Sequence, residues 1–125
     1  MSAAERTRFV VLHHQQGQAA HYDLMVLRQD ALATWKFNAP PQSAGPASLD
    51  CEKLPDHRTA YLDYEGPISD DRGEVQRCDQ GDCHVLHWDD FCVELLFEGK
   101  GLRGRYWIRR RHEAPQRWCF EPLGA

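Results

Sequence analysis

The chain has 125 residues, of which 27% are charged, and its formal net charge at pH 7 is −4. This length fits one domain with a real hydrophobic core and is too short for two ordinary domains. No apolar run approaches the length of a membrane-spanning helix, and the N-terminus lacks the apolar segment of a secretory signal peptide. We therefore expect a single cytoplasmic domain over residues 1–125.

The five cysteines form no Cys-x-x-Cys pair and no even-numbered disulfide framework. This usage is typical of a reduced, intracellular protein whose thiols are structural. A zinc site that uses Cys78 and Cys83 would lack a second ligand pair of the usual spacing.

Alternating apolar and polar residues predict three strands in the first third of the chain, over 8–14, 21–28 and 31–37. Residues 39–48 consist mainly of Pro, Ala, Ser and Gly without a period, so we expect a surface loop there. One helical turn is expected over 50–54. A short strand is then expected over 61–64, ended by Gly66-Pro67.

In the second half of the chain, strands expected over 73–78 and 83–88 flank Asp79-Gln80-Gly81-Asp82, which has the composition of a hairpin turn. Further strands are expected over 91–98, 102–111 and 117–121. No segment has a sustained helical period. Eight or nine short strands in so small a chain indicate an all-β fold, a closed or nearly closed antiparallel barrel of about eight strands with short helical turns, because closure removes exposed edges.

The start of the second strand carries the residues most informative about function. Successive side chains of a strand point to opposite faces, so His21 and Asp23 share one face. His14, at the end of the preceding strand, is placed to join them if the two strands are neighbours. Two imidazoles and one carboxylate bind a divalent ion and leave positions open for water and substrate. The alternative is that His21 lies on a polar barrel face and Asp23 solvates a turn.

Two other features bear on function. His57 precedes the segment that carries Tyr61, and a histidine at a strand entrance can point into a barrel mouth, although such a residue is more often a surface histidine. The segment 103–111 is rich in arginine and contains Trp107. Arginines beside an aromatic ring suit contact with nucleic acid, but on an edge strand they also provide solubility and edge protection.

Several of these segments, in chain order, resemble the 3′-phosphoesterase domain of bacterial DNA ligase D and its small stand-alone relatives. The resemblance covers about residues 8–120. The matching pieces are Arg8-Phe9-Val10-Val11 before His14, His21-Tyr22-Asp23-Leu24, Trp35, Asp56-His57 with Tyr61, Asp63, Tyr64, Glu65 and Gly66, and Leu102-Arg103-Gly104-Arg105-Tyr106-Trp107.

In that family a β-barrel binds a divalent metal, typically Mn²⁺, and removes 3′ phosphates and 3′ ribonucleotides from DNA primer ends before ligation. The resemblance implies that the metal ligands are His14, His21 and Asp23. It also implies that His57 is a catalytic or phosphate-binding residue and that Tyr61 lies near the phosphate. His13 is the rival of His14 as a ligand, but alternation puts it on the opposite strand face.

The sequence departs from the family pattern at several basic positions. Met25 stands where the family usually has an arginine, two residues beyond the metal-binding aspartate. We predict that Met25→Arg raises activity, because the arginine would project beside the metal toward the phosphate; the risk is that Met25 packs in a closed apolar core, where the charge would destabilise the fold. The basic residues that could take over the phosphate contacts are Lys36, Lys53, Arg58, Arg72 and the segment 103–111, and of these we expect Lys36, Arg58, Arg103 and Arg105 to contact the phosphate.

These features together predict a Mn²⁺-dependent 3′-end-processing phosphoesterase that acts on DNA ends in repair by non-homologous end joining. Its expected partners are DNA primer–templates and a separate DNA ligase or polymerase, with no membrane involved. The alternative is a catalytically weakened or inactive barrel that binds DNA ends or a repair partner. A weaker alternative is a phosphatase for some small phosphoester.

Overall fold

The computed structural model describes residues 5–123, which form strands joined by short loops and 3-10 turns. The strands are β1 (Glu5–Gln16), β2 (Ala19–Arg28), β3 (Ala31–Phe37), β4 (Leu49–His57), β5 (Gly66–Pro67), β6 (Glu74–Trp88), β7 (Cys92–Gly99), β8 (Arg103–Arg111) and β9 (Ala114–Pro122). The 3-10 turns are η1 (Pro41–Ser43) and η2 (Thr59–Leu62). In this described range, no helix is long and apolar enough to cross a membrane.

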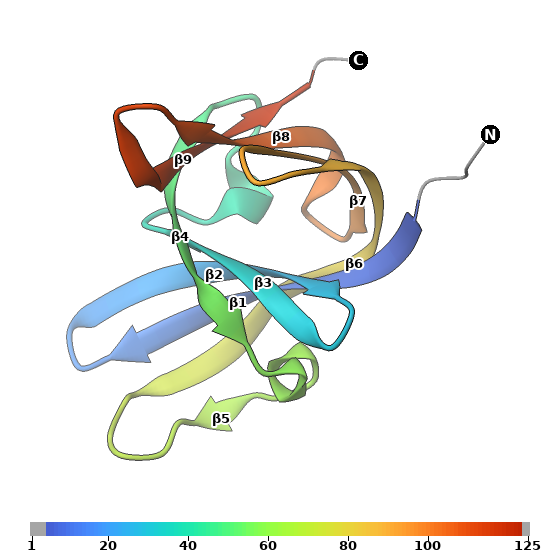
Figure 1. Cartoon of the computed structure of the whole chain (residues 1–125). Coiled ribbons are helices and arrows are strands. Elements are labelled where there is room, and N and C mark those ends of the chain that lie inside the picture. The colour runs from blue at the N-terminus through green and yellow to red at the C-terminus, as the bar shows by residue number, and fades with distance from the viewer. Residues whose placement is uncertain (1–4, 124–125) are drawn as a thin grey trace.

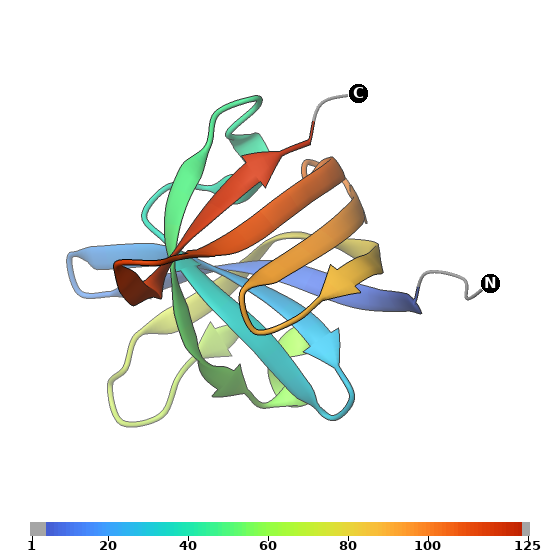
Figure 2. The same ribbon diagram turned by 45° about the horizontal axis from the view of Figure 1, so that its top comes forward.

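Eight of the strands close into an antiparallel barrel (Figure 1). Their order around the barrel is β1-β2-β3-β4-β9-β8-β7-β6, and β6 pairs with β1 to complete the circle, as the second view also shows (Figure 2). The short β5 adds to the free part of β6 outside the circle. The predicted all-β fold, a closed barrel of about eight strands with short helical turns, is therefore confirmed.

Aromatic and aliphatic side chains from all eight barrel strands fill the interior. At one end Tyr106 and Phe120 stack with ring centroids 4.5 Å apart, and Phe37 packs edge-on to Phe120 at 5.2 Å. Trp35 and Ile108 are also fully buried. Because the interior is filled by side chains, a functional site must lie at a barrel end or on the outer wall.

A second apolar cluster lies on the outside of the barrel, over β1 and β2. We call it the outer cluster; its buried members are Val10, Leu12, Met25, Leu32, Leu62 and Val75. It forms because residues 58–73, the covering segment, fold back over this part of the wall below the barrel in Figure 1. The unbroken apolar run Phe9-Val10-Val11-Leu12 is thus explained, since both faces of β1 are buried.

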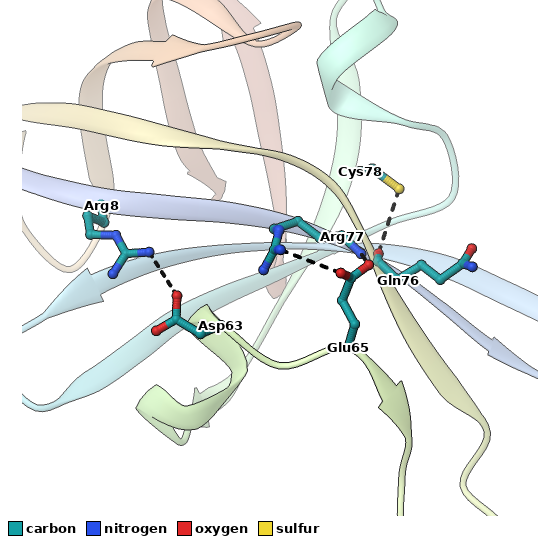
Figure 3. Close-up of polar contacts among 6 residues, drawn as sticks. All are labelled: Arg8, Asp63, Glu65, Gln76, Arg77 and Cys78. Carbon is teal, nitrogen blue, oxygen red and sulfur yellow. Dashed lines mark hydrogen bonds and ion pairs between the residues drawn. The ribbon is translucent and has the colours of Figure 1, made fainter.

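Polar contacts hold the covering segment against the barrel (Figure 3). Arg8 on β1 pairs with Asp63 at 3.1 Å. Glu65 accepts a hydrogen bond from the backbone N–H of Arg77 on β6 at 2.9 Å and contacts its guanidinium at 3.5 Å. The segment is therefore fixed to both β1 and β6, the two strands that close the barrel.

Two local predictions are wrong because long-range pairing overrides local sequence. Residues 50–54 lie in β4 rather than in a helical turn, since this strand pairs with β3 on one side and β9 on the other. Residues 61–64 do not form a strand. Residues 61 and 62 belong to the 3-10 turn η2, and residues 63 and 64 follow it. This turn places Leu62 in the outer cluster.

The predicted hairpin turn over 79–82 is also wrong, because β6 runs through it without interruption. The carboxylate of Asp79 serves a different turn: it accepts hydrogen bonds from the backbone N–H groups of Lys100, Gly101 and Leu102 at 2.9, 3.2 and 2.6 Å. Gly81 is needed for close strand packing, since a Cβ there would lie 2.4 Å from the carbonyl oxygen of Glu98. Both residues therefore support the barrel.

We expect Asp79→Ala to lower the free energy of unfolding by about 2–3 kcal/mol, because it leaves the buried N–H of Leu102 and the part-buried N–H groups of Lys100 and Gly101 without their acceptor. Urea unfolding would measure the loss. The control is Asp82→Ala, which removes only an exposed ion pair with Arg6 and should cost no more than about 0.5 kcal/mol. Equal losses in the two variants would contradict this role for Asp79.

Candidate metal centre

His14, His21 and Asp23 converge on one outer face of the β1–β2 ladder. His14 lies directly opposite His21 in the strand register, and their ring centroids are 4.8 Å apart. Nε2 of His21 lies 3.1 Å from Oδ1 and 3.3 Å from Oδ2 of Asp23. One ligand atom from each of the three residues lies within 4.8 Å of the others. The structure thus brings together the three residues that the sequence predicted as metal ligands.

His13 lies on the other strand face, as alternation predicts. Its ring packs against Tyr22 with centroids 5.0 Å apart, and Tyr22 packs against the interior core. The neighbouring His14 instead faces outward, on the same side as the outer cluster members Leu12 and Val10. His14 is therefore the histidine that can share an ion with His21.

The buried carboxylate of Asp23 fits a metal ligand. Asp23 is only 3% exposed, and its Oδ1 accepts no well-directed hydrogen bond from the described residues although Nε2 of His21 is close. A buried carboxylate oxygen without a partner is costly, and a bound cation is one of the few ways to offset that cost. Two imidazoles and a carboxylate suit Mn²⁺ and other first-row divalent ions.

The covering segment orients the ring of His14. Nε2 of His14 lies 2.7 Å from the carbonyl oxygen of Arg72. Because a carbonyl can only accept, Nε2 carries the proton and Nδ1 keeps a free lone pair for a metal, an arrangement common around metal-binding histidines. Gly73 makes this approach possible, since a Cβ there would lie 2.0 Å from the carbonyl oxygen of Gln15.

A cavity of about 340 Å³ lies between the β1–β2 wall and the covering segment. His14 and Asp23 line it from β1 and β2, and His57, Arg58 and Tyr61 line it as well. His57 lies at the end of β4, where its Nδ1 donates to the carbonyl oxygen of Pro55 at 2.9 Å. Of the two placements considered for His57, a barrel mouth and the outer surface, the structure shows the outer surface, at this cavity.

The predicted phosphate contacts divide into those near this cavity and those far from it. Arg58 lines the cavity, whereas Lys36 lines a neighbouring one with Glu52 and Arg117. Arg103 and Arg105 lie on β8, four strands around the barrel from β2. They contact the carbonyl of Gly99 at 2.9 Å and the carboxylate of Glu94 at 2.6 Å, respectively. The structure therefore does not bring these two arginines to the candidate metal centre.

Arg72, one of the basic residues that the sequence offered as replacements, also lies at this cavity, next to the ligand His14. It lines the cavity, and its guanidinium donates to the carbonyl and hydroxyl oxygens of Ser69 at 2.9 and 3.2 Å. Asp70 and Asp71 adopt positive φ angles of 62° and 55°, which fold the chain so that Arg72 meets His14. Polar residues that tolerate this conformation are a weak sequence signal for such a turn.

Comparison of the sequence with models of known protein families gives no match, and comparison with curated proteins gives none either. The similarity to the DNA ligase D phosphoesterase domain thus remains a hypothesis based on the ordered motifs. The geometry of the residues themselves is the evidence on which a function can be argued.

We expect Mn²⁺ to raise the melting temperature of the natural chain, with a stabilisation near 2.7 kcal/mol when the metal is at about 100 times its Kd. Asp23→Asn should abolish that rise, because it removes the anionic ligand. The metal-free variant should be about as stable as the natural chain, since it no longer buries a carboxylate whose Oδ1 accepts no well-directed hydrogen bond.

The control for this metal test is His13→Ala, which alters the opposite strand face and should keep the metal-induced rise in melting temperature. Thermal unfolding with and without Mn²⁺ measures both variants. A full metal response in Asp23→Asn would show that the ion binds elsewhere.

Proposed function

We propose that this chain is a divalent-metal-dependent phosphoesterase that removes 3′ phosphates or 3′ ribonucleotides from DNA ends. One observation carries the proposal: the ligand atoms of His14, His21 and Asp23 lie within 4.8 Å of one another, and His14 and Asp23 line one cavity with His57 and Tyr61. A metal site that shares a cavity with a histidine, a phenol and an arginine is suited to phosphoester hydrolysis.

A divalent ion, when bound, would polarise the phosphorus centre and neutralise developing negative charge. His57 is suited to proton transfer in this cavity. Its Nδ1 proton is committed to Pro55, so Nε2 is the nitrogen that can take a proton from water or return one to the leaving oxygen. The ring of Tyr61 packs near His57, with centroids 6.0 Å apart, and its hydroxyl can orient a phosphate oxygen.

The positive charge available for the phosphate comes from the covering segment. Arg58 and Arg72 both line the cavity, and the guanidinium group binds phosphate oxygens well because its donors form a planar fork. In this proposal they make the phosphate contact that the family makes through the arginine at the position of Met25. The substrate class, a DNA primer–template with a 3′ phosphate or 3′ ribonucleotide, the choice of Mn²⁺, and the partnership with a ligase or polymerase in end joining rest on the sequence resemblance.

One observation favours the second function, a barrel that binds DNA ends without turnover. Met25 lines the cavity and is 1% exposed, so an apolar side chain fills the position beside Asp23 where the family has an arginine. Loss of one charge-assisted phosphate contact costs about 1.5–3 kcal/mol, which is one to two decades in rate. The decisive experiment is an Mn²⁺-dependent turnover assay on a primer–template that ends in a 3′ phosphate, with DNA binding measured alongside.

We expect His57→Ala to slow hydrolysis of the 3′-phosphate primer by about 10²–10⁴-fold, because it removes the proton-transfer group. Mn²⁺ affinity should stay nearly unchanged, since His57 is not among the residues whose ligand atoms converge. Kinetics and metal titration on the same preparation test both statements. His84→Ala is the matched control, because His84 pairs with Glu98 away from this cavity. Loss of metal binding in His57→Ala would make His57 a ligand instead.

We expect Met25→Arg to lower the free energy of unfolding by about 2–4 kcal/mol and not to raise turnover, because the side chain is packed in the outer cluster. The burial of Met25 thus argues against the gain in activity predicted from the sequence. Melting temperatures and 3′-phosphatase rates of the two proteins measure the effect. A stable variant with faster turnover would show that the arginine reaches the phosphate without burying its charge.

A further inference from the structure

A second cavity, of about 250 Å³, adjoins the cavity at the candidate metal centre, and we call it the side cavity. All of its lining residues belong to the covering segment. Three of them, Arg58, Tyr61 and Ile68, also line the cavity at the metal centre. A substrate bound at the metal centre would therefore meet the side cavity next.

Aromatic rings lead from the first cavity to the side cavity. The ring centroid of Tyr61 lies 6.0 Å from that of His57 and 6.1 Å from that of Tyr64. The planes of the two tyrosine rings are nearly perpendicular, at 84°, and Tyr64 is 39% exposed. Perpendicular rings can contact one planar group, the first with its face and the second with its edge. The side cavity thus offers an accessible surface for a flat aromatic ligand.

The exposed ring of Tyr64 is held in place by its own segment. Its hydroxyl donates to the carbonyl oxygen of Pro67. Gly66 has a φ of 132°, which other residues rarely adopt, and a Cβ there would lie 3.2 Å from the Tyr64 hydroxyl oxygen. A ring that is already fixed loses little conformational freedom when a ligand stacks on it, so more of the contact energy remains for binding.

The charge of the side cavity is confined to the side that it shares with the metal centre. Arg58 is exposed and forms no ion pair with any residue of the range 5–123. The lining residues that belong to the side cavity alone are uncharged: Ala60, Tyr64, Pro67 and Ser69. This distribution fits a ligand whose anionic group lies by the metal centre and whose flat, uncharged part extends away from it.

We propose that the side cavity binds the base of the nucleotide that carries the 3′ phosphate, with the base against Tyr64 and Tyr61 and the phosphate beside Arg58. The inference rests on the proposed function for the position of the phosphate, and it names the part of the DNA end that the site recognises. Stacking accepts every base, because each has a π-face. The site should therefore require a terminal base without preferring one of the four.

The first experiment compares two primer–templates that end in a 3′ phosphate, one on a thymidine and one on an abasic tetrahydrofuran residue. The template lacks a base opposite this residue, so the two ends differ in stacking but not in pairing. Fluorescence anisotropy of a label at the primer 5′ end measures binding to the natural chain in EDTA, which prevents metal-dependent turnover. The end with the base should bind about 5- to 100-fold more tightly. Equal affinities, or no binding of either end, would overturn the proposal.

The second experiment assigns this preference to Tyr64. Tyr64→Ala should lower the affinity for the end with the base to that for the abasic end, and should leave the abasic end unchanged. Tyr64→Phe keeps the ring and should keep most of the preference. Phe91→Ala is the matched control, because it truncates another exposed aromatic side chain that lines neither cavity. Circular dichroism melting verifies folding, and an equal loss for both ends in Tyr64→Ala would overturn the proposal by showing a purely structural role.

Turnover of the same two ends with Mn²⁺ separates this inference from the proposed function. Hydrolysis with the same kcat/KM on both ends would overturn the base site and support the phosphoesterase. Base-dependent binding that Tyr64→Ala removes, without any turnover, would support the base site and contradict the phosphoesterase. Turnover that favours the end with the base would support both.

Discussion

The candidate metal centre depends on one constraint, the attachment of the covering segment to the outer wall of the barrel. Leu62 enters the outer cluster, and two ion pairs fix the segment to β1 and β6. This packing buries Asp23, which would otherwise lie on an exposed sheet face. It also places the carbonyl of Arg72 against His14. Without the segment the three ligands would be ordinary surface residues, and no cavity would face them.

Burial on both faces also fixes the register of the two strands that carry the ligands. A slip of one residue between β1 and β2 would exchange every inward and outward side chain. Here such a slip would expose interior residues such as Phe9 and Leu24 and would also empty the outer cluster. The pairing of His14 with His21 is therefore held by apolar burial, and the ligands need little rearrangement to share an ion.

The sequence predicts the strands that alternate cleanly, and it predicts that His21 and Asp23 share a face. It does not predict β4, η2 or the full length of β6, because their structure depends on partners far away in the chain. Asp79 illustrates the difficulty: its neighbours have turn composition, yet its carboxylate serves a turn some 20 residues later, at Lys100 to Leu102. The packing of Trp35 against Trp88 and Trp118 is likewise not predicted, because these positions show no relation until the barrel closes.

Strand β4 connects the barrel interior with the outer cavity. Lys53 lies opposite Trp35 and faces the inside of the barrel, whereas Leu54 faces the outer cavity, and the shift in register with β3 lets Asp56 and His57 line that cavity as well. Nζ of Lys53 donates to the carbonyl oxygen of Leu54 at 2.7 Å and lies 3.7 Å from the carboxylate of Asp56. Because Asp56 lines the cavity beside His14 and Asp23, the Lys53 ammonium offsets part of the negative charge at the candidate metal centre.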